Sequence, residues 1–477
     1  MRYTLKRLLI IALSLLLLPA SALFAQKSYR ITIQIEGLND SLLLLANYNG
    51  DKQFVADTAF KTKSKIYTFT GNKLLPEGMY FIAGSAKSKL FDFIVAGKQE
   101  IMISGNKDKL PASLNSKNSS ENQAFFDYIR FLSEKQKEQL SLVEEKKKYS
   151  NGSESAEAID NKINQLNTEV KQYIDNIINS KTESFFSAFL KSMQEPEIPV
   201  APILSNGRPD STFAYKYYKA HFWDNINLAD DRLIRTPLLH SKVEQFLNKL
   251  TPPMPDSLIV AIDKLFHLAD ENEESFKYLM WYLTIKFESS EIMGYDAIFV
   301  HLVDTYYADP KMKWMNQTVK DNLIKRANTL RPILIGKNAP EMILLDTLQH
   351  PVSLYKVDAD YTLIYFWDPD CSHCKKETPV LTEFYEKNKA LYSLEVYAVC
   401  MDTSWTDMKK YIQKNKTKWL NVNGFYSMTP DFRELYDVHS SPVMYLLDEN
   451  KKIIAKRVLT EQMKGILKSR TGKDEVK

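Results

Sequence analysis

The sequence predicts a multidomain fold with an N-terminal antiparallel β sandwich or barrel, a central α-helical domain and a C-terminal α/β domain. Three patterns along the 477 residues support this division. Apolar residues often alternate with polar ones up to about Lys109, as they do in strands. From Ser120 to about Leu330 they recur every three or four residues, as they do in helices. Beyond Ile333, short apolar runs alternate with helical stretches.

The first 25 residues have the composition of a secretory signal peptide. Three basic residues precede an apolar run: Arg2, Lys6 and Arg7. The run from Leu8 to Leu18 is too short to cross a bilayer comfortably, and small residues follow it. Cleavage after Ala22 and cleavage after Ala25 both fit. We therefore expect residues 1–25 to be removed and the mature chain to be exported.

The net charge and the cysteine content narrow the classes of function that the chain can have. Without the three cations of the signal peptide, the formal net charge falls from +4 to +1, so no nucleic-acid partner is expected. The chain has only three cysteines, Cys371, Cys374 and Cys400. An exported protein of this size that relied on structural disulfides would carry more of them. The cysteines are therefore expected to serve chemistry.

Residues 26–112 are predicted to form the β-rich domain. Its expected strands are Ile31–Ile35, Ser41–Leu45, Ile66–Phe69, Met79–Ile82, Phe91–Val95 and Ile101–Ile103. Asn49-Gly50 is the clearest hairpin turn between them. No catalytic grouping appears in this domain.

Residues 113–332 are predicted to form the helical domain. Ser120 to Gln123 matches the sequence pattern of a capping box, and a long helical hairpin should follow it. Prolines then interrupt the pattern between Pro196 and Pro209. The histidines of this region lack the spacing of metal ligands: His221, His240, His267 and His301. The sequence assigns no chemistry to this domain.

Residues 333–477 are predicted to form the α/β domain, and they contain Cys371-Ser372-His373-Cys374. The motif lies between a predicted buried strand, Thr362–Trp367, and a predicted helix. Free N–H groups and the helix dipole stabilise an anion at such a junction, here a thiolate of Cys371. Cys374 lies three residues further on, within reach of Cys371 for a disulfide. This position favours a redox dithiol.

Two alternatives compete with a redox dithiol. The motif could be half of a zinc site, but the chain has no second cysteine pair and no His-x-x-x-His. It could be a structural disulfide, but so short a loop constrains little of the unfolded chain. We therefore expect neither a metal nor a cofactor.

The region from about 333 to 470 resembles the thioredoxin superfamily, in particular its TlpA-like exported branch. The matching motifs are Gly336-x-x-Ala339-Pro340, Phe366-Trp367, Cys371-x-x-Cys374-Lys375-Lys376-Glu377-x-Pro379 and Ser441-Pro442. The match covers under a third of the chain and implies a thioredoxin-like fold. The β-rich region more weakly resembles domains that precede such modules in envelope proteins of Gram-negative bacteria. The implied location is the periplasm or cell envelope.

The resemblance also implies roles. Cys371 would be the attacking thiolate and Cys374 the resolving thiol. Pro442 would form a cis-proline loop against the disulfide; the alternative is an ordinary trans proline that starts an edge strand. Glu377 would assist proton transfer, or would simply be a glutamate on the helix surface.

The charges around the motif predict its redox tuning. A protonated His373 in the first helical turn would lower the pKa of Cys371, and Asp368 and Asp370 would oppose this. The reduction potential should then lie between ~−270 mV and ~−120 mV.

Some residues depart from the family pattern. Tyr365 stands where thioredoxin has a buried aspartate, and Asp370 where it has a tryptophan. Asp368 replaces the threonine of peroxiredoxins, which argues against peroxidase activity. Cys400 follows apolar residues on a predicted strand and should be an inert core thiol.

The predicted function is that of an exported thiol–disulfide oxidoreductase that reduces protein disulfides. Its partners would be protein dithiol or disulfide substrates and a thiol electron donor, and a membrane-associated redox partner is compatible with the resemblance. The TlpA-like branch typically acts on specific exported proteins, including apocytochromes. The alternative is an envelope scaffold or binding protein with a vestigial redox module.

Overall fold

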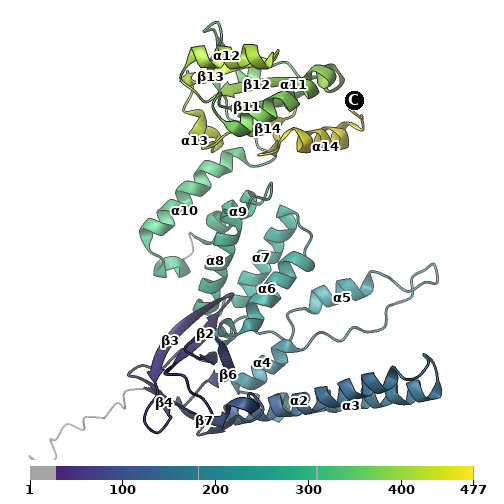
Figure 1. Ribbon diagram of the computed structural model, residues 1–477. Coiled ribbons are helices and arrows are strands. Elements are labelled where there is room, and N and C mark those ends of the chain that lie inside the picture. The colour runs from purple at the N-terminus through teal and green to yellow at the C-terminus, as the bar shows by residue number, and fades with distance from the viewer. Residues whose placement is uncertain (1–27, 181, 308–309, 476–477) are drawn as a thin grey trace, which may run out of the picture. The chain divides into compact units, whose positions relative to one another are not determined.

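The computed structural model describes residues 28–180, 182–307 and 310–475, and the predicted signal peptide lies outside these ranges. The chain forms two compact units. One runs to Leu250 and includes Leu268–Ser275, and the other comprises Thr251–His267 and the chain from Phe276 onward. Figure 1 labels the α-helices and many of the strands of both units.

The first unit begins with two four-stranded sheets. One has the order β4-β1-β7-β8, formed by β4 (Tyr67–Gly71), β1 (Tyr29–Glu36), β7 (Glu100–Asn106) and β8 (Asn115–Lys117). The other has the order β3-β2-β5-β6, formed by β3 (Lys52–Phe60), β2 (Leu42–Asn49), β5 (Gly78–Ala83) and β6 (Lys89–Val95). Alternate side chains are buried, as Ile31, Ile33 and Ile35 are in β1. The predicted β-rich fold is confirmed.

Two details of the predicted β domain are wrong. The described strands form separate sheets and no closed barrel, and β1 pairs with β7 in parallel, so the domain is not wholly antiparallel. The sequence pattern also does not reveal β3 and β8. β3 is exposed along most of its length and therefore lacks alternation, and β8 is only three residues long. β8 pairs with β7 beyond the predicted boundary at residue 112.

Helices follow, as predicted. Their bounds are α2 (Ser120–Lys146), α3 (Glu154–Ser180), α4 (Phe185–Met193), α5 (Phe213–His221), α6 (Pro237–Lys249), α7 (Pro255–Ala269), α8 (Glu273–Glu288), α9 (Asp296–Tyr306) and α10 (Gln317–Leu330). α2 and α3 form the expected hairpin (Figure 1). In this hairpin Phe131 stacks on Tyr173, with 4.0 Å between ring centroids. The residue that caps α2 is Ser119 and not Ser120, because the Asn122 N–H donates to its hydroxyl. Among the described residues, none of the helices combines the length and the apolar character that a membrane span requires.

The last part of the chain is an α/β domain around one seven-stranded sheet, of order β10-β9-β13-β12-β11-β14-β15. Its strands are β9 (Ile343–Asp346), β10 (Pro351–Ser353), β11 (Tyr361–Trp367), β12 (Leu394–Cys400), β13 (Leu420–Ser427), β14 (Val443–Leu447) and β15 (Ile453–Lys456). Its helices are α11 (Ser372–Tyr392), α12 (Trp405–Asn415), α13 (Phe432–Tyr436) and α14 (Thr460–Thr471). β11, β12 and β13 run parallel to one another, so their carboxyl ends leave the sheet at one edge.

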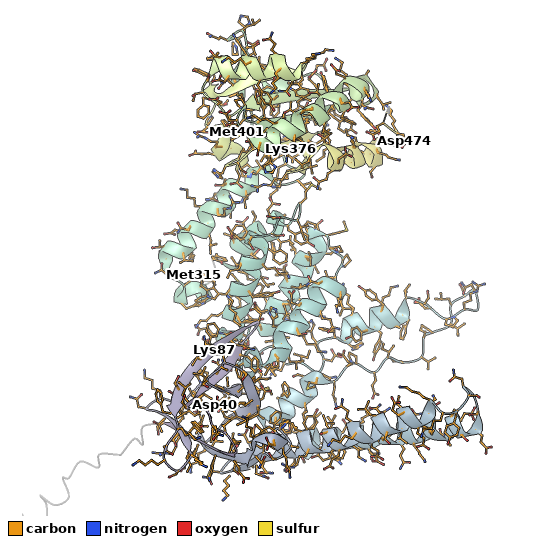
Figure 2. All side chains as sticks on the ribbon, viewed as in Figure 1. Asp40, Lys87, Met315, Lys376, Met401 and Asp474 are labelled. Atoms are coloured by element: carbon orange, nitrogen blue, oxygen red, sulfur yellow. The ribbon has the colours of Figure 1, made fainter. Side chains whose placement is uncertain are left out.

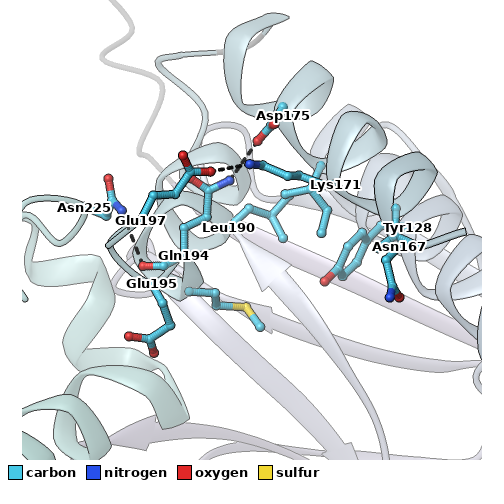
Figure 3. Close-up of a pocket in the computed structure, with 12 residues that line it drawn as sticks. Tyr128, Asn167, Lys171, Asp175, Leu190, Gln194, Glu195, Glu197 and Asn225 are labelled. Carbon is cyan, nitrogen blue, oxygen red and sulfur yellow. Dashed lines mark hydrogen bonds and ion pairs between the residues drawn. The ribbon is translucent and has the colours of Figure 1, made fainter. Parts of the chain in front are cut away.

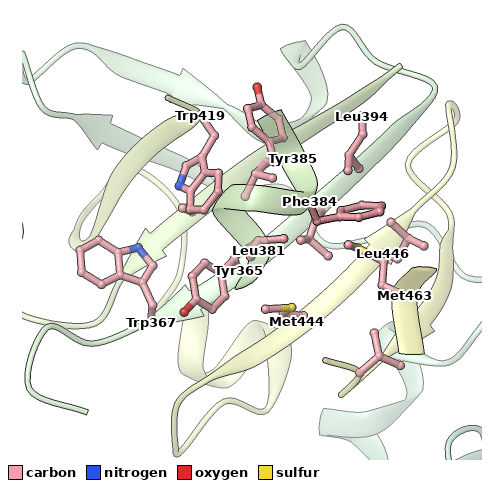
Figure 4. Packing of buried hydrophobic residues seen from close by; sticks show 14 of the residues in the cluster. Tyr365, Trp367, Leu381, Phe384, Tyr385, Leu394, Trp419, Met444, Leu446 and Met463 are labelled. Carbon is pink, nitrogen blue, oxygen red and sulfur yellow. The ribbon is translucent and has the colours of Figure 1, made fainter. Parts of the chain in front are cut away.

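One apolar core joins this sheet to α11, α12 and α14 (Figure 4). Tyr365 and Trp367 of β11 lie in it with Leu381 of α11, and all three are almost fully buried. The core also contains Met408 of α12 and Met463 of α14. These contacts fix the start of α11, and with it the cysteine motif, against the end of the central strand.

Ion pairs tie the preceding helices of the same unit to this domain. The Lys456 ammonium at the end of β15 is 5 % exposed, pairs with Asp296 of α9 and donates to the carbonyl of Ile333 at 2.9 Å. The Asp437 carboxylate after α13 pairs with Arg326 of α10. Two buried charges of the α/β domain, on Lys456 and Asp437, therefore pair with residues that precede Ile333 in the chain.

Candidate active site

Cys371 lies between the end of β11 and the first turn of α11, as the sequence predicts. It is the N-cap residue of α11, and its sulfur accepts the Cys374 N–H at 3.2 Å. As a thiol it also donates to the carbonyl of Ser441 at 3.2 Å. Burial alone would raise the pKa of Cys371. Hydrogen bonds with the Cys374 thiol, with Ser441 and with the N–H groups of Cys374 and His373 outweigh burial and lower this pKa.

The two other cysteines are buried, and their pKa values are raised instead of lowered. Burial raises the pKa of Cys374 to about 12, and the neighbouring Cys371 adds to the effect. Burial likewise raises the pKa of Cys400 to about 12. All three cysteines are free thiols in this structure. Cys371 is therefore the thiol that ionises first, and only it is partly exposed.

The loop before β14 lies against the reactive sulfur. The Ser441–Pro442 peptide bond is cis, as the family resemblance implies, and not the trans bond of the alternative. The Ser441 carbonyl in this loop is the one that accepts from Cys371. Pro442 is thus placed beside the cysteine motif, and its role in aligning a substrate stays a prediction.

Glu377 is on α11 but contacts another helix. Its carboxylate accepts the N–H of Thr460, the first residue of α14, at 2.8 Å. The N-cap of α14 is Leu459, whose side chain cannot accept a hydrogen bond, and so Glu377 provides the missing acceptor. Neither predicted alternative anticipated this capping contact.

Of the residues predicted to tune the motif, His373 and Asp370 are exposed, whereas Asp368 is half-buried and its carboxylate accepts the Asp370 N–H at 2.7 Å. His373 lies in the first turn of α11, where the sequence placed it, and points its side chain to solvent. The carboxylate of Asp370 is 97 % exposed and lies 3.7 Å from the Lys375 ammonium. Solvent screens exposed charges strongly, so their effect on Cys371 should be modest.

A buried group of hydroxyls that sequence reasoning missed lies next to Cys374. Thr378 follows Cys374 by one helical turn, and its hydroxyl is shared by Tyr365 at 2.7 Å and Tyr411 at 2.9 Å. The ring of Tyr411 also stacks on Trp367, with 4.6 Å between centroids. The hydroxyls of Tyr365, Thr378 and Tyr411 thus occupy the place of the buried carboxylate of thioredoxin. They add polarity beside Cys374 without adding a negative charge.

The described residues of the first unit hold a pocket of about 590 Å³ along α3 and α4 (Figure 3). Its rim carries the ion pair of Lys171 with Glu197, and the Gln194 amide donates to Asp175 at 2.9 Å. The residues that line this pocket include no nucleophile beside a base. Among the described residues there is also no group of three potential metal ligands. Neither observation points to chemistry away from the cysteine motif.

The arrangement suits thiol–disulfide exchange. A partly exposed sulfur with a lowered pKa can attack a disulfide, and a buried thiol three residues away can then displace it. Figure 2 shows all side chains on the ribbon, with Lys376 of α11 and Met401 after β12 labelled.

Comparison with known proteins points to the same domain. A family model described as thioredoxin-like matches residues 358–453, and one described as a domain of unknown function (DUF5106) matches residues 153–328. Thiol–disulfide oxidoreductase ResA of Bacillus cereus is 25 % identical over 147 residues, which are 29 % of this chain and 79 % of that protein. ResA of Bacillus subtilis (strain 168) is 28 % identical over 130 residues, 27 % of this chain and 68 % of that protein.

A solved domain of a possible thiol-disulfide isomerase from Cytophaga hutchinsonii ATCC 33406 is 40 % identical, with a TM-score of 0.27. The alignment covers 29 % of this chain and 97 % of that domain. The strand–Cys-x-x-Cys–helix geometry and the match to the thioredoxin-like model agree on one assignment. The C-terminal part of this chain is a thioredoxin-like domain of the thiol–disulfide oxidoreductase class.

Proposed function

We propose that the chain is exported and reduces protein disulfides in the cell envelope, with apocytochromes as one candidate substrate class. The observation that carries the proposal is the asymmetry of the two thiols. Cys371 is partly exposed with a lowered pKa, and Cys374 is buried with a raised one. The basic residues and the apolar run within residues 1–25 support export, because signal peptides have this composition.

The reaction has two exchange steps. The Cys371 thiolate attacks one sulfur of the substrate disulfide, forms a mixed disulfide and expels the other substrate sulfur as a thiolate, which takes up a proton. Cys374 loses its proton and attacks Cys371, which releases the second substrate thiol. The substrate gains two electrons and the protein becomes a Cys371–Cys374 disulfide. A thiol electron donor must then reduce this disulfide.

Insulin reduction with dithiothreitol tests the activity. The wild-type protein should accelerate the appearance of reduced insulin, and Cys371→Ser should abolish the acceleration. Cys400→Ser is the matched control, since it removes a thiol that is fully buried. Equal rates for wild type and Cys371→Ser would contradict the enzyme function and favour a binding protein with a vestigial redox module.

Trapping in cells tests the location and the substrate. Cys374→Ser should accumulate mixed disulfides between Cys371 and its substrates, because the resolving thiol is missing. Mass spectrometry of trapped complexes from the envelope and cytoplasmic fractions would identify the partners. Recovery of these complexes in the cytoplasmic fraction alone would contradict export.

A further inference from the structure

The end of β13 bulges outward from the sheet. Asn423 pairs with Leu345 of β9, but the next paired residue, Ser427, lies opposite Leu344. Gly424, Phe425 and Tyr426 are therefore extra residues on the β13 side of the ladder, and bulges of this kind re-aim side chains, often next to active sites. Phe425 and Tyr426 emerge from the bulge, and each is 40 % exposed.

Neighbouring side chains hold these two rings in place. Trp405 of α12 packs against Tyr426, with 4.9 Å between ring centroids. Phe425 lies edge-on to the buried Phe432 at 6.2 Å, and the guanidinium of Arg433 covers it at 5.1 Å. Ordered aromatic side chains lose little conformational entropy on binding, which suits them to contacts with a partner.

The aromatic ridge, defined as Trp405, Phe425, Tyr426 and Met428, is apolar and open to solvent. Met428 is 70 % exposed, more than either Phe425 or Tyr426. Arg433, which borders the ridge, is already paired with Asp431 at 2.5 Å. The ridge therefore offers little free charge and presents mainly rings and a thioether.

The ridge and Cys371 lie at the same end of the sheet, because both follow the carboxyl ends of parallel strands. In the parallel register, Trp367 lies opposite Cys400, and Cys400 lies opposite Asn423. Cys371 follows Trp367, and the ridge follows Asn423. Adjacent strands are about 4.8 Å apart, which separates β11 from β13 by roughly 10 Å. A standard protein interface covers about 800 Å² on each partner, a disc of roughly 16 Å radius, so a partner centred on Cys371 reaches the ridge.

We propose that the aromatic ridge docks an extended, apolar or aromatic segment that flanks the cysteine of the protein substrate. This inference rests on the proposed function, since it names the class of polypeptide that the redox site serves. The segment must be extended because Cys371 is only partly exposed and its sulfur faces the Ser441 loop. Its side chains must be apolar because the ridge gains free energy mainly by burying apolar surface.

Matched peptide disulfides test the proposal. One cysteine-containing peptide carries tryptophan and phenylalanine beside its cysteine, and the other carries serines there; each is linked by a disulfide to glutathione. Both disulfides accept two electrons, and dithiothreitol returns the protein to its dithiol form. Wild type should reduce the aromatic peptide with a kcat/KM about tenfold higher, as expected for one aromatic contact at an interface.

Trp405→Ala and, separately, Tyr426→Ala should lose most of this tenfold preference, chiefly through a higher KM for the aromatic peptide. Two variants are used so that one poorly folded protein does not decide the matter. Leu348→Ala is the control, because Leu348 is 72 % exposed but follows β9 at the opposite edge of the sheet. This variant should keep the wild-type preference.

The outcomes separate the two proposals. An unchanged preference in both ridge variants would overturn docking on the ridge. Equal losses for both peptides would also overturn it, since the ridge would then support the redox centre itself. If wild type reduced neither peptide faster than Cys371→Ser, the proposed function would fail, independently of the ridge.

Discussion

Replacement of Asp437 by asparagine should weaken both the stability of the α/β domain and its activity. The Asp437 carboxylate is 1 % exposed and pairs with Arg326 of α10 and with Arg457 at 2.5 Å. The residue ends α13 with a φ of 53°, a left-handed conformation that asparagine adopts readily. Asp437→Asn therefore removes the charge and leaves the backbone and the side-chain volume nearly unchanged.

The size of the effect follows from the exposure of the partners. Breaking a fully buried ion pair by removing one partner costs about 3–5 kcal/mol. Here the side chains of Arg326 and Arg457 are 33 % and 54 % exposed, so water can solvate the cations that lose their anion. We therefore expect a smaller loss, about 2–3 kcal/mol of unfolding free energy. For a unit of this size, that corresponds to a decrease in Tm of roughly 4–12 °C.

Urea unfolding and the insulin assay measure the two consequences. Asp437 lies shortly before Ser441, whose carbonyl contacts Cys371, so a loosened loop should also lower kcat/KM. Asp431→Asn is a control, because the Asp431–Arg433 pair is partly exposed and contributes about 0–1 kcal/mol. A loss below about 1 kcal/mol for Asp437→Asn, equal to that of the control, would refute the reasoning.

Three further substitutions test individual residues. Cys400→Ala should leave the insulin reduction rate unchanged, because Cys400 is buried with its pKa raised to about 12; loss of activity in a folded variant would contradict this. Glu377→Ala should cost about 1 kcal/mol in urea unfolding, because α14 loses the acceptor for the Thr460 N–H. If Glu377→Ala instead slowed reduction with stability intact, proton transfer would be its role. His373→Gly should raise the pKa of Cys371 and make the couple more reducing, as read from redox equilibrium with glutathione; no change would show that His373 does not tune the site.

Much of the active site could be predicted from local sequence. A buried strand that ends just before Cys371 and a helix that begins after it are both signalled within a dozen residues. The Ser441–Pro442 turn and its place against the cysteines could be predicted only from the match to a family motif, because local sequence carries no signal for a contact across 70 positions. A local sequence pattern is enough to predict a site that is formed by one strand and the helix that follows it.

Other features depend on contacts between distant residues. The Thr378 hydroxyl meets Tyr365 and Tyr411 only because α11 and α12 pack on the same face of the sheet. The contact of Glu377 with the start of α14 spans 83 positions and has no local signal. The mixed composition of β13 hides this strand, since polar Asn421 and Asn423 are buried in it. No periodicity reveals such strands.

The pH dependence of cysteine alkylation tests the central claim most directly. The reduced protein is treated with iodoacetamide between about pH 5 and pH 9, and mass spectrometry measures the rate at each cysteine. Cys371 should react with an apparent pKa below the ordinary thiol value of ~8.5, and its rate should persist as the pH falls toward neutrality. Cys374, with its pKa raised to about 12, should stay unmodified over this range. Faster alkylation of Cys374, or a Cys371 pKa at or above ~8.5, would contradict the assignment of Cys371 as the attacking thiolate.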